Sequence, residues 1–209
     1  GVFGPPFNSS GTALCGEFQV NTHTAFHQTD SRVTGTGDGG FLVTWTSTDS
    51  AQDGSGYGVF AQRFNSSGTK VGAEFQVNTT TSSHQLHSNP TSLTGGGFVI
   101  TWASNEQDGS GKGVFGQLYD ASGVAVGGEF QINTHTNADQ MLPRVTSLSD
   151  GGFMATWSSD QQDGSGFGAF GQRYDATGNA IGSEFKINTS TNSNQYVDSA
   201  SVLSNGDII

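Results

Sequence analysis

The sequence predicts an all-β protein, and more narrowly a β-propeller of about four four-stranded blades. The first observation behind this prediction is an internal repeat. A seven-residue block at residues 58–64, Gly-Val-Phe-Ala-Gln-Arg-Phe, recurs in closely related form at 113–119 and 168–174, which is a period of 55 residues. A related block opens the chain at residues 1–7. Repeats of about this length are typical of propellers, in which each repeat forms one blade.

The second observation is that each period holds four short runs in which apolar and polar residues alternate. In one copy these runs are residues 89–93, 97–102, 114–119 and 129–133. Phe98, Ile100 and Trp102 share one face of their run, as expected for a strand. The third observation is that Asp-Gly and Gly-Gly turns separate the runs. A solenoid would have a shorter period and a row of sandwich domains a longer one, so blades are favoured.

We interpret residues 1–209 as a single repeat domain whose blades follow the register of the repeat. Three complete blades are predicted at residues 21–78, 79–133 and 134–188. Residues 1–20 supply the third and fourth strands of one more blade, and residues 189–209 supply its first and second strands. A blade split between the termini would close the ring without an open edge. The alternative is that the same ends pair between neighbouring molecules or with further repeats, as in a piece of a longer repeat array.

Charge and composition exclude several classes of partner. Acidic residues outnumber Lys and Arg by 18 to 7, which gives a net charge of −11. A nucleic acid or an anionic membrane surface requires a basic face, so neither is expected as a partner. No apolar run approaches the length of a membrane span, so we expect no membrane insertion. The single cysteine, Cys15, rules out an internal disulfide and is compatible with either the cytosol or a bacterial exterior.

One face of the predicted ring gathers amides and carboxylates at repeated positions. The candidate ligand-binding residues on this face are Asn78, Asn133, Asn188, Gln85, Gln140 and Gln195. The candidate metal-binding residues, with calcium as the candidate cofactor, are Asp53, Asp108 and Asp163. Short polar side chains repeated around a ring suit the binding of a sugar or a cation. The alternative is that they are ordinary turn caps, because Asn-Thr and Asp-Gly pairs commonly end strands without any ligand.

No catalytic constellation stands out in the sequence. The histidines vary between copies, and Gly54-Ser55-Gly56 lacks the strand–turn–helix context of a nucleophile elbow. The tryptophans, Trp45, Trp102 and Trp157, occupy matching positions, and packing between blades is favoured over stacking on sugars. The sequence therefore predicts that the chain is not an enzyme.

The repeat resembles a known family of tandem repeats. It reads Gly-Val-Phe-Gly-Gln-Arg-Tyr-Asp-Ala-x-Gly, then Gly-x-Glu-Phe-Gln-Val-Asn-Thr, then Gly-Gly-Phe-x-x-Thr-Trp-x-Ser and Gln-Asp-Gly-Ser-Gly. Similar repeats occur in very large secreted or cell-surface bacterial proteins, beside calcium-binding repeats and adhesin modules. The resemblance covers essentially the whole chain. It implies an extracellular or cell-surface location, an adhesive or matrix role and no defined enzyme activity. Pro5 and Pro6 depart from the pattern, because proline cannot donate to a strand ladder.

Two functional hypotheses follow from these observations. The main one is a non-catalytic extracellular or cell-surface repeat module with a structural or adhesive role, which assembles through its complementary ends. The alternative is a carbohydrate-binding propeller lectin that uses the Asn/Gln/Asp loop face. The expected partners are therefore glycans or neighbouring copies of the same protein. An extracellular hydrolase carried on a propeller is a third and less favoured reading.

Overall fold

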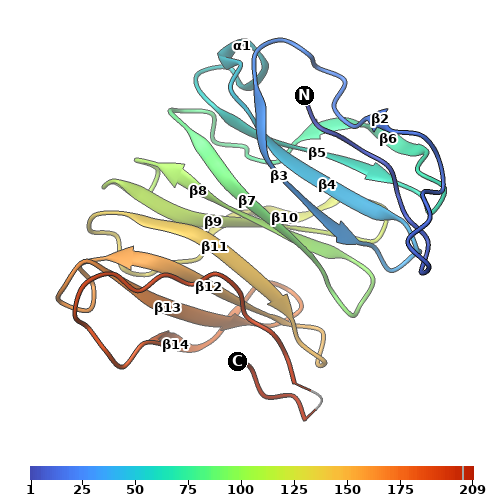
Figure 1. The fold of residues 1–209 in the computed structure, drawn as a ribbon. Coiled ribbons are helices and arrows are strands. Elements are labelled where there is room, and N and C mark those ends of the chain that lie inside the picture. Colours follow the sequence, from blue (N-terminus) through green and yellow to red (C-terminus); the bar gives the residue numbers. More distant parts are fainter. Residues whose placement is uncertain (204) are drawn as a thin grey trace.

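A computed structural model describes residues 1–203 and 205–209, and it consists of antiparallel sheets arranged as a row of blades (Figure 1). The first blade contains β3 (Gln28–Gly35), β4 (Phe41–Ser47), β5 (Gly58–Phe64) and β6 (Lys70–Gln76). The second contains β7 (Gln85–Ser92), β8 (Phe98–Asn105), β9 (Lys112–Tyr119) and β10 (Ala125–Gln131). The third contains β11 (Gln140–Ser147), β12 (Phe153–Asp160), β13 (Phe167–Tyr174) and β14 (Ala180–Lys186). The predicted all-β fold with four-stranded blades is confirmed.

The two middle strands of each blade are buried on both faces, whereas the last strand is largely exposed. In the second blade nearly every residue of β8 and β9 is buried, and the first four residues of β10 are exposed. Trp102 on β8 lies opposite Phe115 on β9 and is completely buried. Phe98 stacks on Tyr119 with ring centroids 4.9 Å apart. Trp102 has equivalents in Trp45 and Trp157, so the tryptophans belong to the core between blades, as the sequence predicted.

The first strands of the three blades, β3, β7 and β11, pack side by side (Figure 1). Each contains a β-bulge at the same repeat position, where the ladder to the second strand skips a residue. The bulged residues Asp30, His87 and Leu142 have φ angles of 51°, 58° and 55°. Positive φ is uncommon for residues other than glycine, and bulges re-aim the side chains around them. The bulges therefore set the direction of the polar side chains along this row.

A hydrogen-bonded bracket holds the segment that leads into each blade against the last strand of that blade. Thr79 follows the first blade, and its backbone N–H and its hydroxyl donate to Oε2 of Glu129 on β10 at 2.8 and 3.0 Å. Gln107, in a loop of the second blade, donates to the other carboxylate oxygen. Equivalent hydrogen bonds link Thr22 to Glu74 and Thr134 to Glu184. We call this arrangement the threonine–glutamate bracket, and it ties the start of each blade to that blade's outer strand.

The loop between the second and third strands of the first blade differs from its equivalents. Ser50–Asp53 forms a single helical turn, α1, which Asp49 caps by accepting the N–H of Ala51 at 3.0 Å. Gly54 ends the turn with a φ of 107°. This loop carries the two residues that the later repeats lack, and the helical turn accommodates them. No helix in the part of the chain that the structure describes has the length and apolarity to cross a bilayer.

The two end segments of the chain do not pair with each other within the described residues, so the predicted split blade is not formed there. β1 (Phe3–Gly4) pairs only with β2 (Phe18–Gln19) among the described residues, and the segment after residue 200 folds back on itself through Val202 and Ile208. The two termini lie at opposite ends of the row (Figure 1). Phe3 is 55% exposed, whereas its repeat equivalent Phe115 is 5% exposed. Within the described residues the two ends therefore pair locally and do not complete one blade together.

Candidate functional site

The predicted site residues lie together in each blade and hydrogen-bond to one another. In the first blade Nδ2 of Asn78 donates to Oδ1 of Asp53 at 2.9 Å and to Oε1 of Gln85 at 3.2 Å. Oδ1 of Asn78 accepts the backbone N–H of Val59 at 2.8 Å. We call this set the amide–carboxylate cluster. The prediction that the aspartates and asparagines share one face of the blades is confirmed.

The same cluster recurs in the other two blades. Asn133 donates to Asp108 and Gln140, both at 3.2 Å. Asn188 donates to Asp163 at 2.8 Å and to Gln195 at 3.2 Å. Asn78, Gln85, Asn133 and Gln140 are buried, whereas Asn188 and Gln195 are only half-buried. The observed role of these side chains is to hold the loops at the strand ends, so only the third cluster presents its members beside open space.

The aspartates are distributed over three blades, one to each cluster. Burial raises the pKa of Asp53, and hydrogen bonds from Asn78 and from the backbone N–H groups of Gly56 and Ser55 lower it again in part. Among the residues that the structure describes, no group of three or more His, Cys, Asp or Glu side chains is placed to hold a metal ion. Binding of calcium through Asp53, Asp108 and Asp163 stays a prediction.

Beside each cluster lies a pair of side chains whose chemistry changes from blade to blade. The backbone N–H of Tyr57 donates to Nδ1 of His84 at 3.1 Å, and the two rings are 4.3 Å apart. At the equivalent position Lys112 donates its backbone N–H and its ammonium group to Asp139. In the third blade these positions are Phe167 and Asn194, and the backbone N–H of Phe167 donates to Oδ1 of Asn194 at 3.0 Å. We call these the rim pairs.

A cavity of about 770 Å³ lies between the third blade and residues 195–200 and 206–209. Asn188 and Gln195 of the third cluster line it, together with Tyr196 and the acidic residues Asp198 and Asp207. Thr156 on β12 also lines the cavity, and its buried hydroxyl has no hydrogen-bond partner within the described part of the chain. Tyr196 is 50% exposed and packs against Phe167 with ring centroids 5.3 Å apart. We call this space the third-blade cavity.

The third-blade cavity combines the groups that a sugar requires. An aromatic ring can stack on the apolar face of a pyranose or furanose ring, and the side chains of Asp198 and Asp207 can accept hydrogen bonds from its hydroxyl groups. The amides of Asn188 and Gln195 already bond to protein groups, so they position this wall of the cavity. Sequence reasoning identified Asn188 and Gln195 but missed Tyr196, Asp198, Asp207 and Thr156. The signal that could have found Tyr196 is its departure from the repeat, since the equivalent positions carry Leu86 and Met141.

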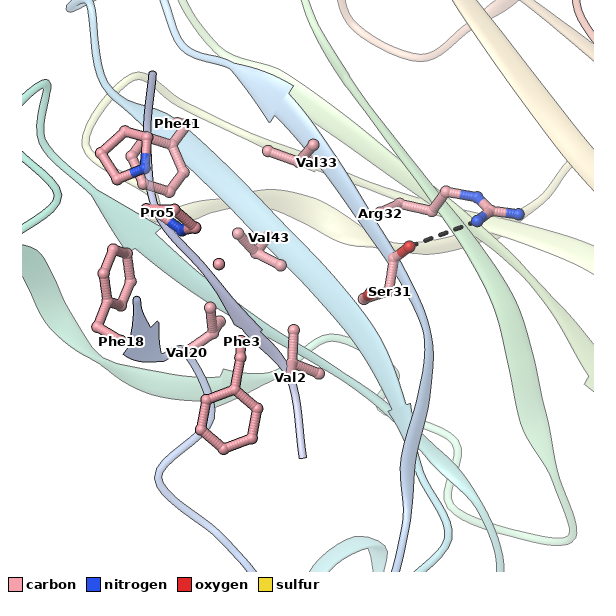
Figure 2. A pocket seen from close by; sticks show the side chains of 12 residues that line it. Val2, Phe3, Pro5, Phe18, Val20, Ser31, Arg32, Val33, Phe41 and Val43 are labelled. Atoms are coloured by element: carbon pink, nitrogen blue, oxygen red, sulfur yellow. Dashed lines mark hydrogen bonds between the residues drawn. The ribbon is translucent and has the colours of Figure 1, made fainter. Parts of the chain in front are cut away.

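A second cavity, of about 280 Å³, lies between β1 and the first blade and is mainly apolar. Figure 2 shows Val2, Phe3, Val20 and Val43 around it, while the side chain of Arg32 is directed away from them. Because few polar groups face this space, it is a poor match for a sugar.

Three comparisons with known proteins were informative to different degrees. No protein-family model and no curated protein sequence matches the chain. Among solved structures, an endo-arabinase from Bacteroides thetaiotaomicron is similar over 84% of this chain and 66% of its own, with a TM-score of 0.51 and 14% identity. A thermostable family-43 glycoside hydrolase is similar over 84% of this chain and 62% of its own, with a TM-score of 0.52 and 10% identity. The chain therefore spans less than two thirds of the length of either structure.

The comparison corrects two expectations from the sequence. The solved structures that share this fold are described as enzymes, so the expectations that the chain is not an enzyme and that its role is structural or adhesive are corrected. At this level of identity the likeness establishes the fold and nothing finer. The error has a physical origin. The residues that line the third-blade cavity come from β12, from the connection after β14 and from the C-terminal segment, so they form no contiguous motif in the sequence.

Proposed function

We propose that this chain is a carbohydrate-binding protein and that it holds a sugar unit in the third-blade cavity. The observation that carries the proposal is the composition of that cavity, in which the exposed aromatic residue Tyr196 lies beside the acidic residues Asp198 and Asp207. The similar structures support the substrate class, since they are described as an endo-arabinase and a glycoside hydrolase. A partner of this kind is also compatible with the net charge of −11, because neutral glycans are not repelled by an acidic protein.

Affinity electrophoresis with arabinan in the gel tests the proposal. We expect arabinan to retard the wild-type protein and Tyr196→Ala to weaken the binding about tenfold, because the variant loses the stacking surface. Tyr57→Ala is the matched control, since Tyr57 is a comparably exposed tyrosine in the first blade and does not line the cavity. Xylan and galactan should be tested in parallel. Failure of all three polysaccharides to retard the wild-type protein would overturn the proposal.

A second candidate function at the same cavity is glycoside hydrolysis. Two carboxylates, Asp198 and Asp207, line it, and most glycosidases use a pair of carboxyl groups about 5–9.5 Å apart. If the cavity hydrolyses its ligand, the wild-type protein should release reducing ends from arabinan. Asp198→Asn and Asp207→Asn should each abolish that release while retardation in the arabinan gel persists. Retardation of the wild-type protein without any release of reducing ends would leave binding as the function.

We further propose that the protein works outside the cytoplasm or at the cell surface. The proposal is supported by the resemblance of the repeat to those of secreted bacterial proteins and by the nature of the proposed ligand. Fractionation of the source cells, with immunodetection of the chain in the medium and envelope fractions, tests it. Detection in the cytoplasmic fraction alone would contradict it.

A further inference from the structure

Two of the few basic residues of this acidic chain occupy the same repeat position on the row of first strands. Arg32 on β3 and Arg144 on β11 each come directly after the bulge, paired with Thr44 and Thr156 of the neighbouring strands. Asn89 holds the equivalent position on β7, the strand between them. The chain has only seven Lys and Arg residues against 18 acidic ones, so two arginines at one repeat position of a single strand row are unexpected from composition.

Hydrogen bonds fix the three strands in this register. Oδ1 of Asn89 accepts the backbone N–H of Val145 at 3.0 Å, and the hydroxyl of Thr91 donates to the carbonyl oxygen of Val145 at 2.9 Å. On the other side, the hydroxyl of Ser92 donates to the carbonyl oxygen of Gly35. β7 is thereby tied to both β11 and β3, and the positions of the two arginines relative to each other are set by the fold.

The bulge places an imidazole–carboxylate pair beside the arginines. Nδ1 of His87 lies 3.6 Å from Oδ2 of Asp30, across the junction of β7 and β3. Burial lowers the pKa of His87, Asp30 raises it, and the nearby positive charges of Lys112, Arg144 and Arg32 lower it further. Burial also lowers the pKa of Arg144, as does the repulsion of Arg32, whereas the negative charge of Asp198 raises it in part. Arg32, His87 and Arg144 are therefore close enough to feel one another's charge.

Neither guanidinium group is neutralised by a direct ion pair in the part of the chain that the structure describes. Nε of Arg144 donates to the backbone carbonyl of Asp198 at 2.7 Å, and Nη1 donates to that of Pro143 at 3.0 Å. Arg32 makes one long hydrogen bond, 3.4 Å from Nη1 to the carbonyl oxygen of Ser31, and its side chain extends away from the apolar cavity (Figure 2). Each group keeps unused donors, and planar guanidinium groups match a carboxylate well.

We propose that Arg32 and Arg144 together bind the carboxylate of a uronate residue in a glycan, which makes the ligand an acidic rather than a purely neutral polysaccharide. This inference rests on the proposed function. The bond between Arg144 and the carbonyl of Asp198 joins the pair to the third-blade cavity, because Asp198 lines that cavity. The net charge of −11 disfavours a dense polyanion, so the uronate is an isolated side group on an otherwise neutral chain.

Affinity electrophoresis with glucuronoxylan and with unsubstituted xylan tests the inference. Glucuronoxylan should bind the wild-type protein about tenfold more tightly than xylan, which is the size expected for one charged hydrogen-bonded contact. Arg32→Gln and Arg144→Gln should each remove that preference. Lys186→Gln, which removes the same charge from the exposed outer strand β14, should retain it. Arg144→Lys serves as a second variant if the half-buried Arg144→Gln protein does not fold.

The outcomes separate this inference from the proposed function. Loss of the preference in the arginine variants but not in Lys186→Gln would support the uronate site. Equal binding of xylan and glucuronoxylan, with Tyr196-dependent binding of arabinan intact, would overturn the uronate site and leave the proposed function standing. Competition by inorganic phosphate as strong as that by free glucuronate would also overturn it, because the pair would then be a general anion site. Failure to bind any glycan would overturn the proposed function itself.

Discussion

The threonine–glutamate bracket allows a quantitative test of how the blades hold together. Glu129 accepts two hydrogen bonds from Thr79 of the preceding connection and one from Gln107 of its own blade. A hydrogen bond to a charged group contributes about 1.5–3 kcal/mol, and the partial exposure of this carboxylate reduces that value. We therefore expect Glu129→Ala to lower the free energy of unfolding by about 2 kcal/mol. With a urea m-value of about 2 kcal/mol/M, the midpoint should fall by about 1 M.

The chain supplies a matched control for this substitution. Glu17 occupies the same repeat position as Glu129, but it is exposed and makes no bracket hydrogen bond within the described residues. Glu17→Ala should change the free energy of unfolding by less than about 0.5 kcal/mol. Urea titrations followed by the fluorescence of the buried tryptophans measure both variants. Equal midpoints for Glu17→Ala and Glu129→Ala would show that the bracket does not stabilise the row of blades.

Three further predictions concern the core, the strand row and the candidate cation. Gly97→Ala should destabilise the protein by more than about 2 kcal/mol, because the added Cβ would lie 2.4 Å from the carbonyl oxygen of Tyr119. Gly128 has open space around it, so Gly128→Ala should leave the thermal unfolding transition nearly unchanged. The folded-state pKa of His87 lies below the usual 6.5, so the unfolded chain binds the proton more readily and the stability should fall as the pH drops from 7 towards 5. In melting temperatures measured across this range, His87→Gln should reduce the dependence on pH. An unchanged dependence in the variant would contradict the assignment. If Asp53, Asp108 and Asp163 bind calcium, a chelator should lower the melting temperature and Asp108→Asn should remove the effect, whereas an unaffected melting temperature would leave these residues as loop anchors.

Much of the fold could be predicted from the sequence because the repeat makes each local signal appear several times. The alternation in residues 97–102 and the Asp-Gly turns are enough to place the strands of a blade. Closure of the ring could not be predicted in the same way. The curvature of the row depends on how β3, β7 and β11 pack, and that packing includes bulges at Asp30 and His87 that no local motif announces.

The residues of the candidate site could also be predicted only in part from the sequence. The Asn, Asp and Gln positions were found because they recur, yet recurrence selected side chains that the fold itself uses. The amide nitrogen of Asn78 donates hydrogen bonds to Asp53 and Gln85, and its amide oxygen accepts one from the backbone N–H of Val59. Tyr196, by contrast, breaks the repeat and lines an open cavity. In a chain built by duplication, positions that differ between copies are better candidates for binding than positions that agree.

The rim pairs show how such differences are tolerated. The same backbone N–H, at residue 57, 112 or 167, is bonded by a histidine, an aspartate or an asparagine. The requirement at this point is one hydrogen-bond acceptor, which many side chains can supply. The companion side chain is tyrosine, lysine or phenylalanine, and each makes a different contact at the loop end. The loop ends can therefore be diversified while the scaffold beneath them is unchanged, much as antibody loops vary on a fixed sandwich. A combinatorial library randomised at these six positions should fold and would give a family of proteins with different rims.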